Sequence, residues 1–338
     1  MLSDILGQEE VAKRLLTAFR QGRLAHAYIL SGPDGVGKMP FAVELAKTLL
    51  CAHRDEPGFA DACEQCPSCR KIRHGNHEDL IIVEPAGKAD IIKFEMTNEL
   101  IEVLRLKARS GEHRFVIIHG ADKMHESTAN HFLKTLEEPP TDVTFLLLTS
   151  RLPALLPTIV SRCQVVRMRR TPADRIAAFL QARGYEAPKA RLYAALADGC
   201  PGKAIAMDES GAFERLERLL RRIEELSPEN DVELASATLA DNKGATLTAT
   251  RDSLVEELGL LAALCRDMTL LAEGADARLY NPDLPEPLRR RARQAGSDAL
   301  RGLTLAVLEA RSDIQRFVNP DLVIGRLFGE LAARVPGK

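Results

Sequence analysis

The chain has 338 residues, 45% of them hydrophobic, and its 46 basic residues nearly balance its 48 acidic ones. We expect two or three domains from this length, and the net charge of −2 gives no overall positive field for sequence-independent DNA binding. The absence of Trp and an aromatic content of 4% also argue against base stacking as a main activity.

The N-terminal sequence and the cysteine content indicate the compartment. The first stretch, MLSDILGQEEVAKRLL, lacks the uninterrupted apolar core of a signal peptide, and no later stretch is long enough to span a bilayer. We therefore expect a cytoplasmic protein. Four of the seven cysteines lie between residues 51 and 69, and in a reducing compartment such crowding favours metal binding over disulfides.

The first 170 residues alternate strand and helix signals. Short apolar runs bounded by turn-forming residues predict buried strands at Ala27–Leu30, Leu80–Val83, Phe115–Ile118 and Thr144–Leu148. Amphipathic stretches between them predict helices at Phe41–Leu50, Met96–Lys107 and Ser127–Leu136. This alternation predicts an α/β domain, residues 1–170, with a doubly wound parallel sheet of the nucleotide-binding kind.

From Thr171 onward the sequence predicts helices only. Residues 171–210 read as a small helical domain, with helices at Ala173–Arg183 and Pro188–Ala197 and a shorter one from Lys203. Residues 211–338 read as a third, all-α domain with long amphipathic helices at Phe213–Leu226, Arg251–Ala272 and Pro320–Val335.

A basic run lies in this third segment at Arg289, Arg290, Arg291 and Arg293. We interpret it as a solvated helix face, with a contact to a partner or to DNA as the alternative.

A phosphate-loop pattern follows the first predicted strand. The sequence Gly32-Pro33-Asp34-Gly35-Val36-Gly37-Lys38 matches G-x-x-x-x-G-K between a strand and a helix. In such a loop the glycines let backbone N–H groups face phosphates, and Lys38 reaches the outer phosphates. A Gly-rich turn without a ligand is the alternative.

Two parts of a hydrolytic site are missing beside this loop. Met39 stands where Ser or Thr would bind Mg²⁺, and a thioether is a poor ligand for a hard cation. His119-Gly120 stands after the third strand, where an Asp-Glu pair would hold the metal and polarise water. Asp122, two residues on, is interpreted as part of a helix start. We expect no ATP hydrolysis by this chain, although the loop leaves weak or vestigial ATP or ADP binding open.

The cysteines at 51, 63, 66 and 69 form the pattern C-x11-C-x2-C-x2-C. Four thiolates in one short segment suit tetrahedral Zn²⁺, so Cys51, Cys63, Cys66 and Cys69 are the expected ligands of a structural zinc site within an insertion at 51–69. Four protein ligands leave no position for a reactive water, so this metal would not be catalytic. Four reduced cysteines without metal are the alternative.

Three further stretches, with the phosphate loop and the cysteine cluster, resemble the bacterial clamp-loader AAA+ family, and within it the delta-prime branch of DNA polymerase III subunits. They are NHFLKTLEEPP at 130–140, LLPTIVSRC at 155–163 and Val318-Asn319-Pro320. The opening Gly7-Gln8 and His26-Ala27-Tyr28 also look like this family, and the resemblance runs nearly from end to end.

This resemblance implies roles for several residues. In the family, the Ser-Arg-Cys triplet supplies an arginine finger to ATP on a neighbouring subunit, and Arg162 holds that position. An arginine with fixed fork geometry stabilises charge on a transferred phosphoryl group, which is a physical reason for the role; an internal salt bridge is the alternative. Thr149 matches the first sensor position of the family. Active motors of the family often carry an arginine in the segment that corresponds to Gly199–Ala204. Lys203 lies in this segment and would be a weaker, monodentate phosphate contact.

The resemblance also implies domain roles and partners. Residues 1–170 would be the AAA+ domain, 171–210 the lid, and 211–338 a collar in a hetero-oligomer with gamma/tau-type and delta-type subunits. The complex would load the sliding clamp onto primed DNA during replication, as part of the DNA polymerase holoenzyme, a nucleotidyltransferase. The Met39 and His119-Gly120 defects favour a stationary, non-hydrolysing subunit.

Three alternatives remain open from the sequence. The first is an active gamma/tau-type ATPase, which shares the cysteine cluster and the Ser-Arg-Cys triplet. The second is an independent AAA+ loading factor that turns over alone. The third is a zinc-dependent nucleic-acid-binding module, which the near-neutral charge and the few aromatic residues disfavour.

Overall fold

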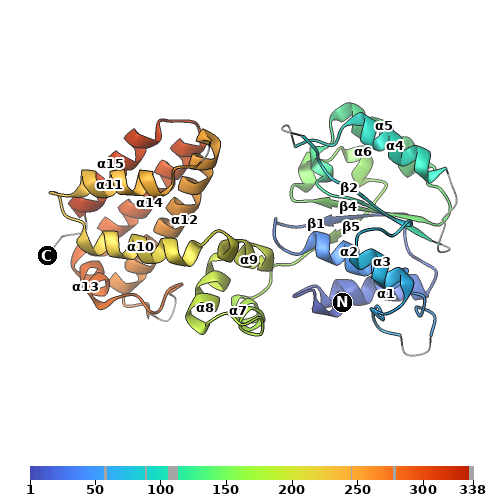
Figure 1. Ribbon diagram of the computed structural model, residues 1–338, viewed down its shortest axis with the longest axis horizontal. Coiled ribbons are helices and arrows are strands. Elements are labelled where there is room, and N and C mark those ends of the chain that lie inside the picture. Colours follow the sequence, from blue (N-terminus) through green and yellow to red (C-terminus); the bar gives the residue numbers. More distant parts are fainter. Residues whose placement is uncertain (57–58, 88–89, 106–112, 245, 277–278, 335–338) are drawn as a thin grey trace. The chain divides into compact units, whose positions relative to one another are not determined.

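The computed structural model describes residues 1–338 except 57–58, 88–89, 106–112, 245, 277–278 and 335–338 (Figure 1). Contacts divide the chain into two compact units, one formed by residues 1–176 and 198–203 and the other by 177–197 and 204–338. The three-part division expected at 170/171 and 210/211 stays a prediction. Parts of the helices expected at Met96–Lys107 and Pro320–Val335 lie outside the described residues.

The first unit contains a five-stranded sheet with the order β2-β3-β4-β1-β5, in which every pairing is parallel. Its strands are β1 (Ala27–Ser31), β2 (Leu80–Val83), β3 (Arg114–Ile118), β4 (Val143–Thr149) and β5 (Gln164–Arg167). The α/β fold class with a phosphate loop after β1 is confirmed. Because all strands run the same way, the loops that follow them gather at one edge of the sheet.

Strand β5 is absent from the sequence-based prediction. It is an edge strand that pairs only with β1 within the described sheet, and three of its four residues are exposed. The sequence Gln-Val-Val-Arg therefore shows neither the buried apolar run of a central strand nor turn residues at both ends.

Helices cover both faces of the sheet (Figure 1). One face packs against α1 (Glu9–Arg20) and α2 (Lys38–Leu49), with Tyr28, Leu30, Phe115 and Leu146 in the shared core. The other face packs against α4 (Phe94–Leu104), α5 (Glu126–Glu137) and α6 (Pro157–Val160). Alternate residues of β1 point to opposite cores, as expected for a strand buried on both sides.

The described residues of the second unit form helices joined by turns and loops, and contain no strand. Its helices are α8 (Ala187–Leu196), α10 (Ala212–Glu225), α11 (Asp231–Asp241), α12 (Leu247–Ala272), α13 (Glu286–Ala295), α14 (Ser297–Gln315) and α15 (Pro320–Arg334). Helices α7 (Ala173–Gln181) and α9 (Pro201–Glu209) each begin in the first unit and end in the second. Among the described helices, none combines the length and apolarity needed to cross a membrane.

The interpretation of the basic run at 289–293 as a solvated helix face is wrong for part of the run. Arg291 is buried and donates hydrogen bonds to the carbonyl oxygens of Ile223 at 2.6 Å and Leu226 at 3.4 Å. These bonds satisfy carbonyl groups at the C-terminus of α10, which have no partner within the helix. Arg290 and Arg293 are exposed, as expected.

Candidate metal, phosphate-loop and arginine sites

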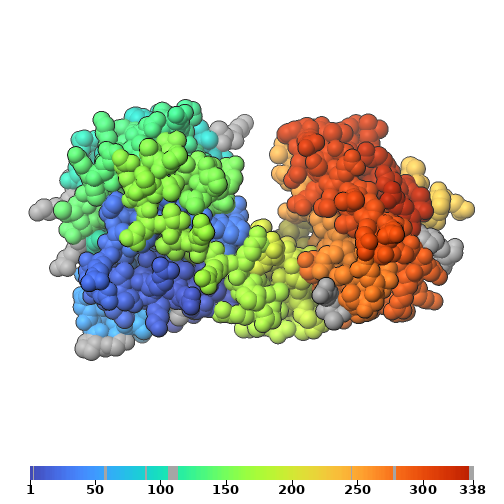
Figure 2. Space-filling model, turned by 180° about the vertical axis from the view of Figure 1, so that it is seen from behind, coloured from blue at the N-terminus to red at the C-terminus, as the bar shows by residue number. Residues whose placement is uncertain are grey.

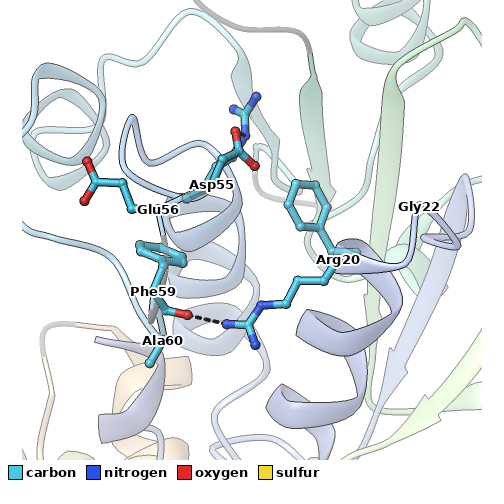
Figure 3. Close-up of a pocket in the computed structure, with 8 residues that line it drawn as sticks. Arg20, Gly22, Asp55, Glu56, Phe59 and Ala60 are labelled. Carbon is cyan, nitrogen blue, oxygen red and sulfur yellow. Dashed lines mark hydrogen bonds and ion pairs between the residues drawn. The ribbon is translucent and has the colours of Figure 1, made fainter.

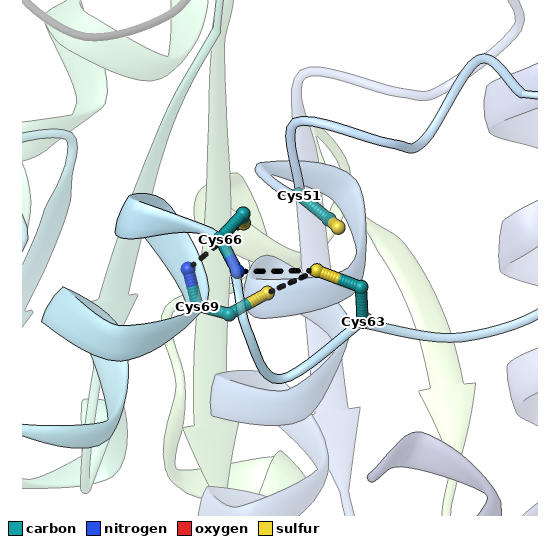
Figure 4. A group of neighbouring side chains, drawn as sticks. All are labelled: Cys51, Cys63, Cys66 and Cys69. Carbon is teal, nitrogen blue, oxygen red and sulfur yellow. Dashed lines mark hydrogen bonds between the residues drawn. The ribbon is translucent and has the colours of Figure 1, made fainter.

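The four predicted metal ligands meet between the end of α2 and the start of α3 (Pro67–Arg73), as Figure 4 shows. Their Sγ atoms all lie within 4.8 Å of one another. Cys51 follows the C-terminus of α2, Cys66 is the N-cap of α3, and Cys69 lies in its first turn. The cluster therefore depends on two helix ends rather than on a free loop.

This arrangement suits a four-coordinate metal ion. A tetrahedral Zn²⁺ with ligands at about 2.3 Å separates its sulfur atoms by about 3.8 Å. The Sγ atoms of Cys63 and Cys69 are 4.0 Å apart. The N–H groups of Cys66 and Cys69 donate to the sulfurs of Cys63 and Cys66 at 3.3 and 3.4 Å, which stabilises negative charge on those sulfurs.

The thiols of the cluster differ in how readily they ionise. Burial opposes ionisation of Cys63, but hydrogen bonds from the Gln65 and Cys66 backbones and from the Cys51 thiol lower its pKa to about 6. Burial raises the pKa of Cys51, and burial together with the bond to Cys66 raises that of Cys69. A bound cation would offset the cost of these buried thiolates.

Polar contacts fix the insertion that carries the cysteines. The buried Lys47 ammonium lies 2.7 Å from a carboxylate oxygen of Glu44 and 2.5 Å from one of Glu64, next to Cys63. Ser68 and His77 bond at 2.8 Å between Oγ and Nε2, which ties α3 to the segment before β2. No pattern in the sequence predicts that Lys47 or His77 supports the cysteine cluster. Neither residue belongs to a motif, and their partners Glu64 and Ser68 are 17 and 9 residues away.

The phosphate loop has the predicted strand-loop-helix geometry. Gly35 and Gly37 have φ values of 78° and 103°, which disfavour other residues, and α2 begins at Lys38. The Lys38 ammonium is buried and donates to the carbonyl oxygens of Gly32 at 2.7 Å and Pro33 at 3.0 Å. A phosphate bound here would compete with these loop oxygens for the ammonium group.

Lys203 lies directly against the phosphate loop. The N–H of Gly202 donates to the carbonyl of Gly35 at 2.8 Å, and a Cβ atom on Gly35 would come within 2.8 Å of the Lys203 backbone nitrogen. Gly35 is therefore required both for its φ angle and for this close approach. The structure brings together Gly32, Gly35, Gly37, Lys38 and Lys203 of the predicted nucleotide site.

The Mg²⁺-binding hydroxyl and the acidic pair are absent, as expected, and Met39 and His119-Gly120 stand in their places. Met39 packs against the core under the sheet, and His119 is exposed beside Glu84, with Nδ1 and Oε1 3.3 Å apart. Asp122 lies in a short 3₁₀ turn, Ala121–Lys123, as the helix-start interpretation implies. Its carboxylate, however, has a further role.

Asp122 holds the end of β4. Its side chain, 3% exposed, accepts hydrogen bonds from the Thr149 hydroxyl at 2.8 Å and from Arg151 Nε at 3.1 Å. The Thr149 hydroxyl in turn accepts the backbone N–H of Arg151 at 3.0 Å, and the Thr149 carbonyl accepts the N–H of Gly32 at 3.2 Å. Thr149, the predicted sensor residue, is thus a fully bonded strand-terminal group next to the phosphate loop.

Arg162 follows the short helix α6, and its side chain is 34% exposed. Its guanidinium donates to the Thr158 carbonyl at 2.9 Å and forms an ion pair with Glu137 of α5 at 2.5 Å. The internal salt bridge considered as an alternative is therefore present, while part of the guanidinium remains open to solvent.

A hollow of about 840 Å³ lies between the end of α1 and residues 54–56 and 59–60 of the insertion (Figure 3). Phe19 and Phe59 line it, and Arg20 donates to the Phe59 carbonyl. None of the predicted site residues borders this hollow, so it supports no assignment among them.

Comparison with known proteins shows what this chain is similar to. A family model described as DNA polymerase III, delta subunit matches residues 7–172. DNA polymerase III subunit delta' of Bacillus subtilis is 29% identical over 322 residues, covering 92% of each chain, and the Escherichia coli subunit delta' is 26% identical over 92% of this chain and 90% of its own. The tau/gamma subunit of Haemophilus influenzae is 38% identical, but over only 48% of this chain and 22% of its own.

These similarities separate two kinds of relative. The delta' subunits match along almost their whole length, whereas the tau/gamma match covers about half of this chain and a minor share of the relative. The chain is therefore similar to the delta' subunits of bacterial DNA polymerase III over nearly its whole length, and to a tau/gamma subunit over about half of it.

Proposed function

We propose that this chain is the non-hydrolysing delta-prime-type subunit of a bacterial clamp loader, which acts in the cytoplasm and helps place the sliding clamp on primed DNA. The observation that carries this proposal is the match to delta' subunits over 92% of the chain. Its partners would be gamma/tau-type and delta-type subunits, with the clamp and the DNA engaged by the whole complex.

The residues at the sheet edge beside the phosphate loop support the proposed absence of hydrolysis. Phosphoryl transfer to water requires a bound divalent cation and a group that orients the attacking water. Met39 packs into the core, and both oxygens of Asp122 are occupied by Thr149 and Arg151. Any nucleotide held by Lys38 and the loop would therefore lack the metal anchors needed for turnover.

Arg162 is the residue through which this chain would act on ATP. Its own phosphate loop lacks a hydrolytic site, so a guanidinium presented to solvent on this unit would serve the nucleotide of a neighbouring subunit. There it would stabilise charge that develops on the transferred phosphoryl oxygens. The partly open guanidinium, fixed in orientation by its internal bonds, supports this role.

The cysteine cluster would hold one structural Zn²⁺ through Cys51, Cys63, Cys66 and Cys69. The sulfur positions fit a closed tetrahedral shell, and a closed shell leaves no place for substrate or water. The ion would secure the insertion to the ends of α2 and α3.

The second unit would provide the collar of the oligomer. Large apolar side chains are exposed there at Leu305, Leu308, Phe317 and Leu322, on or next to α14 and α15 (orange to red in Figure 2). Exposed apolar groups of this size favour burial against a partner. Helices of other loader subunits are the partners that the proposed function supplies.

Co-purification tests the assignment. The chain is mixed with gamma/tau-type and delta-type subunits of the same organism, and the mixture is resolved by gel filtration. A stable complex that loads clamps onto primed DNA, and that fails to load when this chain is omitted, is the expected result. Failure to enter the complex would reject the proposed function.

An active gamma/tau-type ATPase is the second candidate, because the phosphate loop keeps its three glycines and a buried Lys38. The two candidates differ in the behaviour of the isolated chain. Mg²⁺-dependent turnover by the purified chain, abolished by Lys38→Ala, would favour the motor and reject the stationary subunit.

A further inference from the structure

The guanidinium of Arg162 is held by groups from two separate helices. Its Nη1 atom donates to the Thr158 carbonyl at 2.9 Å and to the Ser161 hydroxyl at 3.4 Å, within its own turn. Its Nη2 atom donates to Glu137 Oε1 at 2.5 Å, and Glu137 is the last residue of α5. Among the described residues, these three bonds use three of the five N–H donors of the side chain, which leaves two for another ligand.

The ion pair between Glu137 and Arg162 contributes little to the stability of the fold. The two side chains are 47% and 34% exposed, and ion pairs in such positions typically add little to the stability of a protein, because water screens them. Its main physical effect is on conformation, because a free arginine side chain samples many rotamers, whereas this one is fixed at both nitrogen atoms of its fork.

We propose that Glu137 is a positioning residue for Arg162: it holds the guanidinium in the orientation that an oxyanion of a neighbouring subunit's nucleotide requires. This inference rests on the proposed function, in which Arg162 acts in trans. Because the side chain is ordered before the oxyanion arrives, the reaction does not have to supply the conformational entropy of fixing it. A guanidinium held in the wrong place would stabilise the oxyanion less and would strongly lower kcat.

The chain offers a matched control for Glu137. Glu138 follows it directly, is also exposed, and makes no ion pair among the residues that the structure describes. Removing either carboxylate changes the net charge by the same amount. Only Glu137 contacts the guanidinium, so a difference between the two variants reports the contact itself.

The experiment compares reconstituted loader complexes that contain wild-type chain, Glu137→Ala, Glu137→Gln, Glu138→Ala, Arg162→Ala or the double variant Glu137→Ala/Arg162→Ala. Gel filtration checks assembly, and thermal melting checks the fold. The readouts are kcat and KM for ATP in the presence of clamp and primed DNA.

We expect Glu137→Ala to lower kcat at the site served by Arg162 on the order of tenfold, with KM for ATP unchanged, because ground-state nucleotide contacts are untouched. Glu137→Gln keeps a neutral acceptor and should retain part of the rate, and Glu138→Ala should match wild type. The double variant should be no slower than Arg162→Ala, since Glu137 acts only through that arginine.

The outcomes separate this inference from the proposed function. An assembled Arg162→Ala complex with wild-type kcat would reject the role of Arg162 itself. If Arg162→Ala is slow but Glu137→Ala equals wild type, Glu137 does not position the arginine. A faster Glu137→Ala complex would also overturn the inference, because it would show that the carboxylate masks the guanidinium.

Discussion

The cysteine cluster and the phosphate loop lie in the same unit, and each has a recognisable spacing, but they differ in completeness. All four cysteines converge with sulfur separations that suit one metal ion. The phosphate loop keeps its glycines and Lys38, yet its metal-binding hydroxyl is replaced by Met39 and its acidic pair by His119-Gly120.

This difference shows which property each region still requires. A four-cysteine site functions by closing a shell, so loss of any ligand removes it. A phosphate loop also organises the polypeptide: Gly35 receives the Gly202 backbone, and Lys38 bonds the loop carbonyls. The loop geometry can therefore serve the fold after hydrolysis is lost.

Loss of the metal should produce the largest effect. The purified chain should contain about one zinc, and Cys66→Ser should lose it, because structural zinc sites stabilise folded segments by roughly 10 kcal/mol or more. Elemental analysis measures the ion, and limited proteolysis around residues 51–69 measures the local order. Circular dichroism should show the main sheet still folded.

Cys265→Ser provides the control, since Cys265 is buried in α12 of the second unit and is not one of the four clustered cysteines. It should keep the zinc. Metal-free wild-type protein prepared without chelator, or global unfolding of Cys66→Ser, would show that the role given to the cluster is wrong.

Removing the charge of Asp122 should have the next largest effect. Asp122→Asn removes the charge of a side chain that is 3% exposed and accepts the Thr149 hydroxyl beside the phosphate loop, and a hydrogen bond to a charged group contributes about 1.5–3 kcal/mol. Chemical denaturation should show a loss of that size. Asp90→Asn, which breaks an exposed pair with Lys123, should cost less than about 1 kcal/mol. Equal losses would mean that Asp122 does not fix this edge.

Acid should weaken the sheet that supports both sites. Burial lowers the pKa of His113, whose Nε2 atom bonds the hydroxyl of Thr144 in β4 at 2.9 Å. As the pH falls through the unfolded value of about 6.5, the unfolded chain takes up a proton that the folded chain resists, so stability falls by up to about 1.4 kcal/mol per pH unit. Denaturation between pH 7.5 and 5.5 should show this slope. His113→Gln should reduce it, and an unchanged slope would exclude His113.

Repairing one defect of the phosphate loop should have no effect on turnover. Met39→Thr restores a hydroxyl, but Asp122 remains paired with Arg151 and no acidic pair follows β3. The purified variant should release no more phosphate from ATP than wild type in the presence of Mg²⁺. Appreciable turnover would indicate that Asp122 leaves Arg151 and binds the metal.

Much of this organisation can be predicted from local sequence. The central strands, the phosphate loop and the cysteine cluster appear as short contiguous patterns, and the structure places each as expected. The edge strand β5 has no such pattern, and the buried position of Arg291 depends on carbonyl groups 65 or more residues away. The pairing of Arg162 with Glu137 likewise joins two helices, so spacing alone does not reveal it.

One measurement tests the central claim directly, because it compares the loss of this chain's phosphate-loop lysine with the loss of its arginine finger. Loader complexes are assembled with wild-type chain, Lys38→Ala or Arg162→Ala, and the ATPase stimulated by clamp and primed DNA is compared. The account predicts that Lys38→Ala leaves the rate unchanged, whereas Arg162→Ala lowers it, since an arginine finger contributes on the order of 10³-fold at its own site. A loss with Lys38→Ala and none with Arg162→Ala, in fully assembled complexes, would contradict the account.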